Sequence, residues 1–353
     1  MASSGELIVG ICYLVISVFF FILNGLLFAT LFWKKDLNTI TYRIIKSLTI
    51  SCMMQLFAQA VGGIMTIAQT TFDYYIDRVL GVAVQSGWTL YVSLTLTLGV
   101  DRVLIFICPI STAYMVSTTL LLSLSWLLWL VSVVVRSLPG FGTTYGRDNI
   151  YYIWTYCKGE GAKVLLQIEP YFIMSIFAAV LLLYVFLVYR IVKMKMSSTT
   201  SQSASFRREV KILLAAVISF VYEVFSVVWG YWILPNEHEQ NRVTMSVVLN
   251  FTWIVECGMF VTMTLIISNS LRKKLIRLVL PKYSTVNVSR VQNLWDFRET
   301  VGDDRVQAVE DNDKRNRRGA TDETHTIASA DLCLPLFNRR SCEGTILTVT
   351  GLL

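Results

Sequence analysis

Two glutamates, Glu223 and Glu256, each lie within a long run of apolar residues. A charged side chain at the centre of a bilayer costs about 2.5–3.5 kcal/mol on insertion scales, so each glutamate requires a reason. Two carboxyls at similar depth in a low-dielectric interior do not both ionise cheaply, and we expect at least one to be protonated at neutral pH. The pair either contacts a cationic or hydrogen-bond-donating ligand or senses protons, or both carboxyls are packing groups that bond to neighbouring helices.

Other chemistries find little support in the sequence. The seven cysteines show no metal-ligand spacing and no paired framework, and the two histidines, His238 and His325, are far apart. We therefore expect no metal site and no cofactor. An intramembrane enzyme would need a Ser–His pair, paired aspartates in helices or a histidine-rich metal site, and none of these is present. The sequence predicts that the protein is not an enzyme.

Both glutamates fall in segments that are long and apolar enough to cross a bilayer as helices. The hydrocarbon core requires about 20 helical residues, each rising about 1.5 Å. Seven such spans are predicted, at residues 7–32, 42–68, 80–107, 117–136, 164–189, 210–234 and 245–268. Only 16% of the residues are charged and 54% are hydrophobic, whereas about a quarter of a soluble domain is charged. We predict an all-α integral membrane protein, a seven-transmembrane helix bundle.

The basic residues near the span ends are unevenly distributed between the two sides. Sixteen lysines and arginines lie on the side that contains the loops after spans one, three and five, and six lie on the other side. The positive-inside rule assigns the richer side to the cytosol, so the N-terminus is outside and the C-terminus inside. The net charge of +7 is explained in this way, and no nucleic-acid partner is expected.

This topology divides the chain into three parts. Residues 1–6 are expected to form a short extracellular N-terminus, and residues 7–280 the seven-helix bundle. After span seven, residues 268–280 alternate basic and apolar side chains at helical spacing, which predicts a short amphipathic helix on the inner leaflet. Residues 281–353 are polar and mixed in charge and are expected to be a largely disordered cytosolic tail.

A charged pair stands at the predicted inner end of span three. Asp101 and Arg102 are adjacent, and Pro109 follows seven residues after the arginine. This resembles the Asp-Arg-Tyr motif of rhodopsin-like G-protein-coupled receptors, with Val103 in place of the tyrosine. The resemblance implies that the arginine is held by a carboxylate at rest and then freed to meet a heterotrimeric G protein; Glu209, at the start of span six, is a second candidate carboxylate.

The stretch from Trp253 through Gly258 to residues 269–272 (Asn-Ser-Leu-Arg) resembles the end of helix seven in nematode serpentine chemoreceptors. Residues 34–37 and 42–45 are similar to the first inner loop of that group, nearest the Srt or Srx type. The resemblance covers residues 7 to about 280. It implies a multi-pass receptor of the plasma membrane, with the cilium of a sensory neuron as one candidate location. Such a receptor binds a small extracellular molecule and activates a G protein through helices three, five and six.

Several rhodopsin-like features are missing. There is no Cys-Trp-x-Pro in span six and no Asn-Pro-x-x-Tyr in span seven. Counting back from Arg102, Asp77 occupies the position of the usual disulfide cysteine above helix three, so Cys157 in the second outer loop has no expected partner. We predict that this disulfide is absent and that the loop is correspondingly mobile.

Aromatic and polar side chains in the outer halves of the spans are typical of a small-molecule pocket. Some of these aromatic rings could instead be anchors at the membrane interface, and Pro170 is expected to kink span five. The candidate pocket residues are Gln85, Trp88, Tyr91, Glu169, Glu223, Trp229, Trp253 and Glu256.

Two other membrane functions compete with a receptor. A small-solute transporter typically shows inverted repeats and several paired charges near the midplane, and this chain has one candidate pair and no repeat. A ligand-gated channel of the insect odorant type has the opposite orientation. Both alternatives are therefore less favoured than a chemosensory receptor.

Overall fold

The computed structural model describes residues 4–33, 39–107, 112–146, 153–197, 204–233, 239–267, 271–272 and 275–276. The chain divides into two units, Met1–Lys282 and Tyr283–Leu353, and every described residue belongs to the first. The expected tail at residues 281–353 lies outside the described residues, as does Pro109. Of the expected amphipathic helix at 268–280, the described residues 271–272 and 275–276 are helical.

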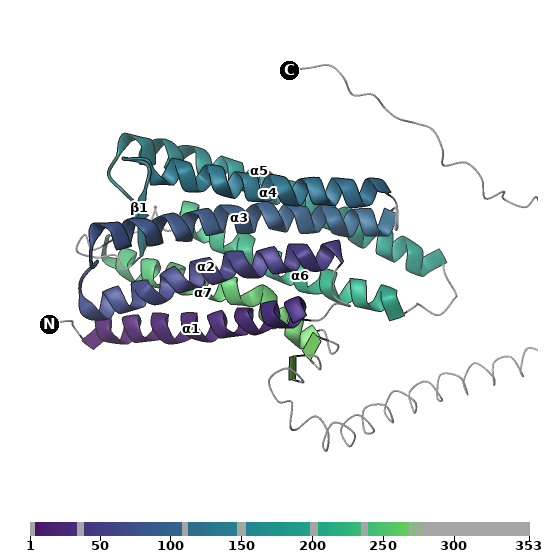
Figure 1. Ribbon diagram of the computed structural model, residues 1–353, viewed down its shortest axis with the longest axis horizontal. Coiled ribbons are helices and arrows are strands. Elements are labelled where there is room, and N and C mark those ends of the chain that lie inside the picture. Colours follow the sequence, from purple (N-terminus) through teal and green to yellow (C-terminus); the bar gives the residue numbers. More distant parts are fainter. Residues whose placement is uncertain are drawn as a thin grey trace, which may run out of the picture. The chain divides into compact units, whose positions relative to one another are not determined.

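The described part of the chain is a bundle of long helices (Figure 1). The seven helices are α1 (Ser4–Trp33), α2 (Ile40–Ala68), α3 (Tyr74–Ile107), α4 (Thr112–Ser137), α5 (Glu160–Ser197), α6 (Ala204–Val228) and α7 (Glu239–Ile267). Each is long and apolar enough to cross a membrane. The predicted spans are confirmed as helices, and all seven begin before the predicted residue. Helix α5 runs through Pro170 without interruption.

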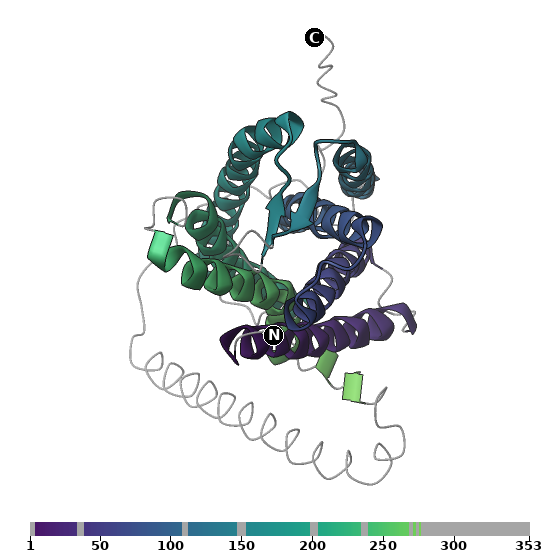
Figure 2. The same cartoon turned by 90° about the vertical axis from the view of Figure 1, so that its left-hand side faces the viewer.

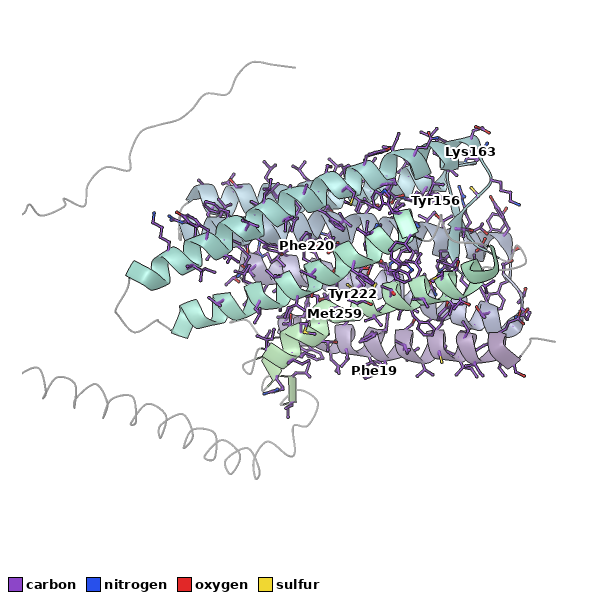
Figure 3. All side chains as sticks on the ribbon, turned by 180° about the vertical axis from the view of Figure 1, so that it is seen from behind. Phe19, Tyr156, Lys163, Phe220, Tyr222 and Met259 are labelled. Atoms are coloured by element: carbon purple, nitrogen blue, oxygen red, sulfur yellow. The ribbon has the colours of Figure 1, made fainter. Side chains whose placement is uncertain are left out.

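Helix α3 forms the centre of the bundle. Leu90, Leu94 and Leu98 on this helix are almost fully buried. Helices α1 and α4 instead present many apolar side chains outwards: Phe19 of α1 has an exposed fraction of 56% (Figure 3) and Val131 of α4 one of 50%. A soluble bundle would bury such rings and branched chains, whereas contact with lipid leaves them stable where they are.

Helices α1 and α2 approach each other closely because glycines face each other. A Cβ atom on Gly63 would lie 2.8 Å from the backbone nitrogen of Leu14, and one on Gly10 would lie 2.8 Å from Cγ1 of Ile67. Both distances are shorter than carbon atoms tolerate. Small residues let helix backbones pack in a membrane, where burial of apolar surface gives no preference for protein over lipid.

A short β hairpin covers one end of the bundle, which we call the hairpin end (Figures 1 and 2). Strands β1 (Thr143–Tyr145) and β2 (Trp154–Tyr156) pair antiparallel with Thr144 opposite Thr155. The rings of Tyr145 and Trp154 meet edge to face at 5.0 Å between centroids, and both side chains are buried. The N-terminus of α1 lies at the same end (Figure 1).

Asp77 holds this hairpin to α3. One carboxylate oxygen accepts a hydrogen bond from the Tyr145 backbone N–H at 2.8 Å, and the other accepts one from the Thr144 hydroxyl. Cys157 is a free thiol, as the sequence predicts. These hydrogen bonds tie the described part of the loop to α3, an attachment that the sequence analysis did not predict.

Candidate functional site

A cavity of about 700 Å³ lies beneath the hairpin, and we call it the hairpin-end cavity. Helices α3, α5, α6 and α7 and strand β2 all contribute to its wall, together with the π-helical turn η2 (Trp229–Ile233) that ends α6. Figure 3 shows Tyr156 of β2 at this level of the bundle, with Phe220 and Tyr222 deeper along α6. The volume of the hairpin-end cavity falls within the range of small-molecule pockets.

The aromatic walls of the cavity are fixed by contacts among helices. Trp88 of α3 stacks on Tyr91 with centroids 5.9 Å apart and meets Trp253 of α7 edge to face at 6.0 Å. The Trp253 indole N–H donates to Oε1 of Gln55 in α2 at 2.8 Å. Because these rings are held from behind, their faces present a preorganised apolar surface to the cavity.

Four predicted pocket residues line the cavity together: Gln85, Trp88, Trp253 and Glu256. Tyr91 lies behind this wall, buried and stacked on Trp88. The prediction missed the contributions of the hairpin and of η2. The missed lining residues include Ile153, Trp154, Thr155, Tyr156, Ser226, Tyr231 and Ser246.

Glu169 and Trp229 do not line the hairpin-end cavity, which corrects the predicted pocket. Glu169 of α5 forms a buried ion pair with Arg136 of α4, with 3.0 Å between Oε1 and Nη2. This pair lies in a separate cleft of about 210 Å³ among α3, α4 and α5. The Trp229 ring packs against Phe225 at 5.6 Å. In both cases helical rotation, which apolar composition does not fix, directs the side chain elsewhere.

The two glutamates inside the bundle are buried at different levels. Glu256 is 2% exposed and lines the cavity, and Ser226 of α6 lies beside it. Glu223 is fully buried, does not line the cavity, and lies within electrostatic reach of Glu256, Tyr91 and Tyr184. Helices α6 and α7 thus bring the two carboxyls near each other, although only Glu256 reaches the cavity.

Neither carboxyl has a basic partner among the described residues. Both oxygens of Glu223 and Oε1 of Glu256 lack any hydrogen bond. Buried polar atoms in proteins are hydrogen-bonded in the great majority of cases. The packing interpretation, in which both groups bond to neighbouring helices, thus finds no hydrogen bond for Glu223 or for Oε1 of Glu256.

Asp101 and Arg102 lie at the opposite end of α3, and both are fully buried. Oδ2 of Asp101 accepts hydrogen bonds from Nη2 of Arg102 at 2.9 Å and from the hydroxyl of Thr41 in α2 at 2.8 Å. Oδ1 accepts from the hydroxyl of Tyr114 in α4 at 2.9 Å. Three helices therefore meet at one carboxylate. Glu209 lies in α6, and its side chain is outside the described residues.

Two further polar side chains also connect helices. The Asn24 amide of α1 donates to the Cys257 carbonyl of α7 at 3.2 Å. The indole N–H of Trp126 in α4 donates to the Ser47 hydroxyl of α2 at 3.2 Å. Each side chain therefore has a defined structural role in this bundle.

In the described part of the chain, the fold is a bundle of seven helices, each able to cross a membrane, with a cavity at one end and a buried Asp–Arg pair at the other. Comparison with protein-family models and with curated proteins finds no match.

Proposed function

We propose that this chain is a G-protein-coupled receptor of the rhodopsin-like superfamily that binds a small molecule in the hairpin-end cavity. The observation that carries the proposal is a single helix with both sites on it. Helix α3 contributes Trp88 to the cavity and Arg102 to the buried ion pair. The two residues are 14 positions apart, or about 21 Å at 1.5 Å per residue. A change in the cavity can therefore be transmitted along one rigid element.

In the proposed orientation, the hairpin end is extracellular and the Arg102 end is cytosolic. The distribution of lysine and arginine supports it. Arg102 is fully buried, so the bundle would have to open at this end before a G protein could contact the guanidinium. The structure then corresponds to a resting receptor, and a ligand that favours the open state would shift the population.

The likeness of residues 34–37, 42–45 and 253–272 to nematode serpentine chemoreceptors supports a chemosensory role. We infer a plasma-membrane location, with the cilium of a sensory neuron as one candidate site. The partners in this proposal are an environmental small molecule, a heterotrimeric G protein and the bilayer.

A direct test is ligand-dependent G-protein dissociation, followed by energy transfer between labelled subunits in cells that express the full chain. Odorant panels should produce a response that Arg102→Ala abolishes at equal surface amount. Lys163→Ala is the matched control, because it removes an exposed basic group at the hairpin end, paired to Glu160 at 2.7 Å. A response that survives Arg102→Ala would contradict the proposal.

A small-solute transporter or ligand-gated channel remains the second candidate, because the carboxyl pair Glu223 and Glu256 lies inside the bundle without a basic partner among the described residues. Such pairs mark ion pathways in transporters. Odorant-evoked current or solute uptake in cells that lack G-protein α subunits would favour this candidate. The receptor proposal predicts neither.

A further inference from the structure

Among the described residues that line the hairpin-end cavity, one has a carboxylic side chain and none is a lysine, arginine or histidine. That carboxyl, Glu256, is 2% exposed. An anionic ligand would meet a like group with no counter-charge in the wall. A cationic ligand would find an acceptor in a low-dielectric site, where an ion pair is far stronger than in water.

The Glu256 carboxyl has unused capacity to accept. Its Oε1 has no hydrogen-bond partner, and Ser226 beside it donates its hydroxyl to the Tyr222 carbonyl at 3.0 Å. Glu223 lies behind it, fully buried and with neither oxygen bonded. Two such carboxyls that share one negative charge create a region that favours positive charge, and no basic residue of the described chain pairs with either. A donor group delivered through the cavity would satisfy the free oxygen.

The cavity wall suits a cation in a second, independent way. Two indoles, Trp88 and Trp253, and the rings of Trp154, Tyr156 and Tyr231 surround the space. Aromatic faces attract ammonium groups, tryptophan most strongly. Tyr156 already binds a cation on one side, since the Arg136 guanidinium lies 5.7 Å from its ring centroid.

The remaining lining residues indicate which size and polarity the uncharged part of such a cation has. The other polar groups are few, among them Gln85, Thr155 and Ser246, and the rest of the wall is apolar or aromatic. A volume of about 700 Å³ accommodates a compact molecule with an alkyl or aryl skeleton. Several charges on one ligand would leave all but one without a partner at the wall, which disfavours polyamines.

We propose that the hairpin-end cavity binds a monocationic amine whose ammonium group pairs with Glu256 and whose apolar body packs on Trp88 and Trp253. This inference rests on the proposed function, because it names the ligand class of the same cavity. Glu256 is a binding residue in it, and Glu223, one level deeper, belongs to the pair that carries one negative charge between its two carboxyls.

The test uses the purified full chain in lipid nanodiscs without any G protein. Binding is measured by calorimetry for a panel of alkyl and aryl monoamines, each paired with the alcohol of the same skeleton, such as 2-phenylethylamine with 2-phenylethanol. At least one amine should bind about 10- to 100-fold more tightly than its alcohol, the range for one charge-assisted hydrogen bond. Glu256→Gln should remove this difference and leave alcohol binding unchanged.

Glu160→Gln is the matched control, since it removes a carboxyl that is exposed on the first turn of α5, and it should leave every affinity unchanged. Glu223→Gln should weaken amine binding less than Glu256→Gln does. The inference would be overturned if no amine of the panel bound more tightly than its alcohol, or if the preference for an amine persisted in Glu256→Gln. Correct folding of each variant is checked by its thermal unfolding temperature.

The outcomes separate this inference from the proposed function. Amine binding in nanodiscs that never leads to G-protein dissociation in cells would reject the receptor and keep the ligand class. G-protein dissociation evoked by neutral or anionic odorants, with no amine bound by the purified chain, would keep the receptor and reject the ligand class.

Discussion

Asp101 accepts hydrogen bonds from Arg102, Thr41 and Tyr114, and its replacement by asparagine tests whether this cluster keeps the bundle closed. Asp101→Asn preserves the shape of the side chain and removes its charge. Arg102, which is fully buried, then loses its ion pair with Asp101. Loss of one partner from a buried ion pair costs about 3–5 kcal/mol. That cost applies to the closed state, because an opened Arg102 end gives the guanidinium access to water.

A destabilisation of about 3 kcal/mol corresponds to roughly a 100-fold shift in the equilibrium between closed and open states. If the open state of the unmodified chain is populated at about 0.1%, the variant would populate it at about 10%. Basal nucleotide exchange on a purified G protein should therefore rise by up to two orders of magnitude without ligand. The assay requires the same amount of chain, reconstituted in nanodiscs, for each variant.

Two milder variants provide a reference for the rise in basal nucleotide exchange that is expected of Asp101→Asn. Tyr114→Phe and Thr41→Val each remove one hydrogen bond to Asp101 and keep the ion pair. A hydrogen bond to a charged group contributes about 1.5–3 kcal/mol, and relaxation around the remaining partners reduces this, so each should raise basal exchange by about tenfold. Basal exchange in Asp101→Asn that equals the unmodified value, or that falls below Tyr114→Phe, would refute the reasoning.

Three further predictions concern the architecture. Asp77→Ala should expose the hairpin, so that a water-soluble maleimide labels Cys157 several-fold faster, as measured by mass spectrometry; an unchanged rate would mean that other contacts hold the loop. Gly63→Ala should lower the thermal unfolding temperature, by the equivalent of about 1–3 kcal/mol for overpacking, because its Cβ would lie 2.8 Å from a backbone nitrogen of α1. Arg136→Met should cost about 3–5 kcal/mol by leaving the buried carboxylate of Glu169 unpaired, and combination with Glu169→Leu should recover most of it; equal losses in the single and double variants would argue against this pair.

The positions of the helices could be predicted from sequence because length and apolar composition alone set them. Each span is long enough to cross a bilayer, and charged residues lie in every connection but the one between spans three and four, where Pro109 marks the break. The predicted ends fell short where the helices continue past the apolar run, as α3 does from residue 80 back to Tyr74. Helical hydrogen bonds are still favourable there, although the side chains turn polar.

The location of a candidate site residue was most predictable where its depth in the bilayer also required its side chain to point into the bundle. Glu223 and Glu256 are too costly to face lipid, so an interior location follows from their type alone. Trp229 and Glu169 could face several neighbours, and their rotation depends on packing that a single sequence does not encode.

The hairpin was not predicted from sequence. The second outer loop was expected only to lack a disulfide and to be mobile. Thr-Thr-Tyr at 143–145 and Trp-Thr-Tyr at 154–156 are rich in β-branched and aromatic residues, and Gly, Asp and Asn lie between them. That pattern is typical of a β hairpin and was the available signal. The cavity depends on it, since β2 supplies part of the wall.

The attachment of the hairpin to α3 also has a chemical consequence for how the protein is handled. Hydrogen bonds to the Asp77 carboxylate join the loop and the helix, so their strength does not depend on the redox potential of the medium. A sulfur–sulfur link at this place would need an oxidising compartment to form and would open in thiol reductants. The hairpin should therefore form on α3 in a reducing cell-free extract and stay attached to it in dithiothreitol.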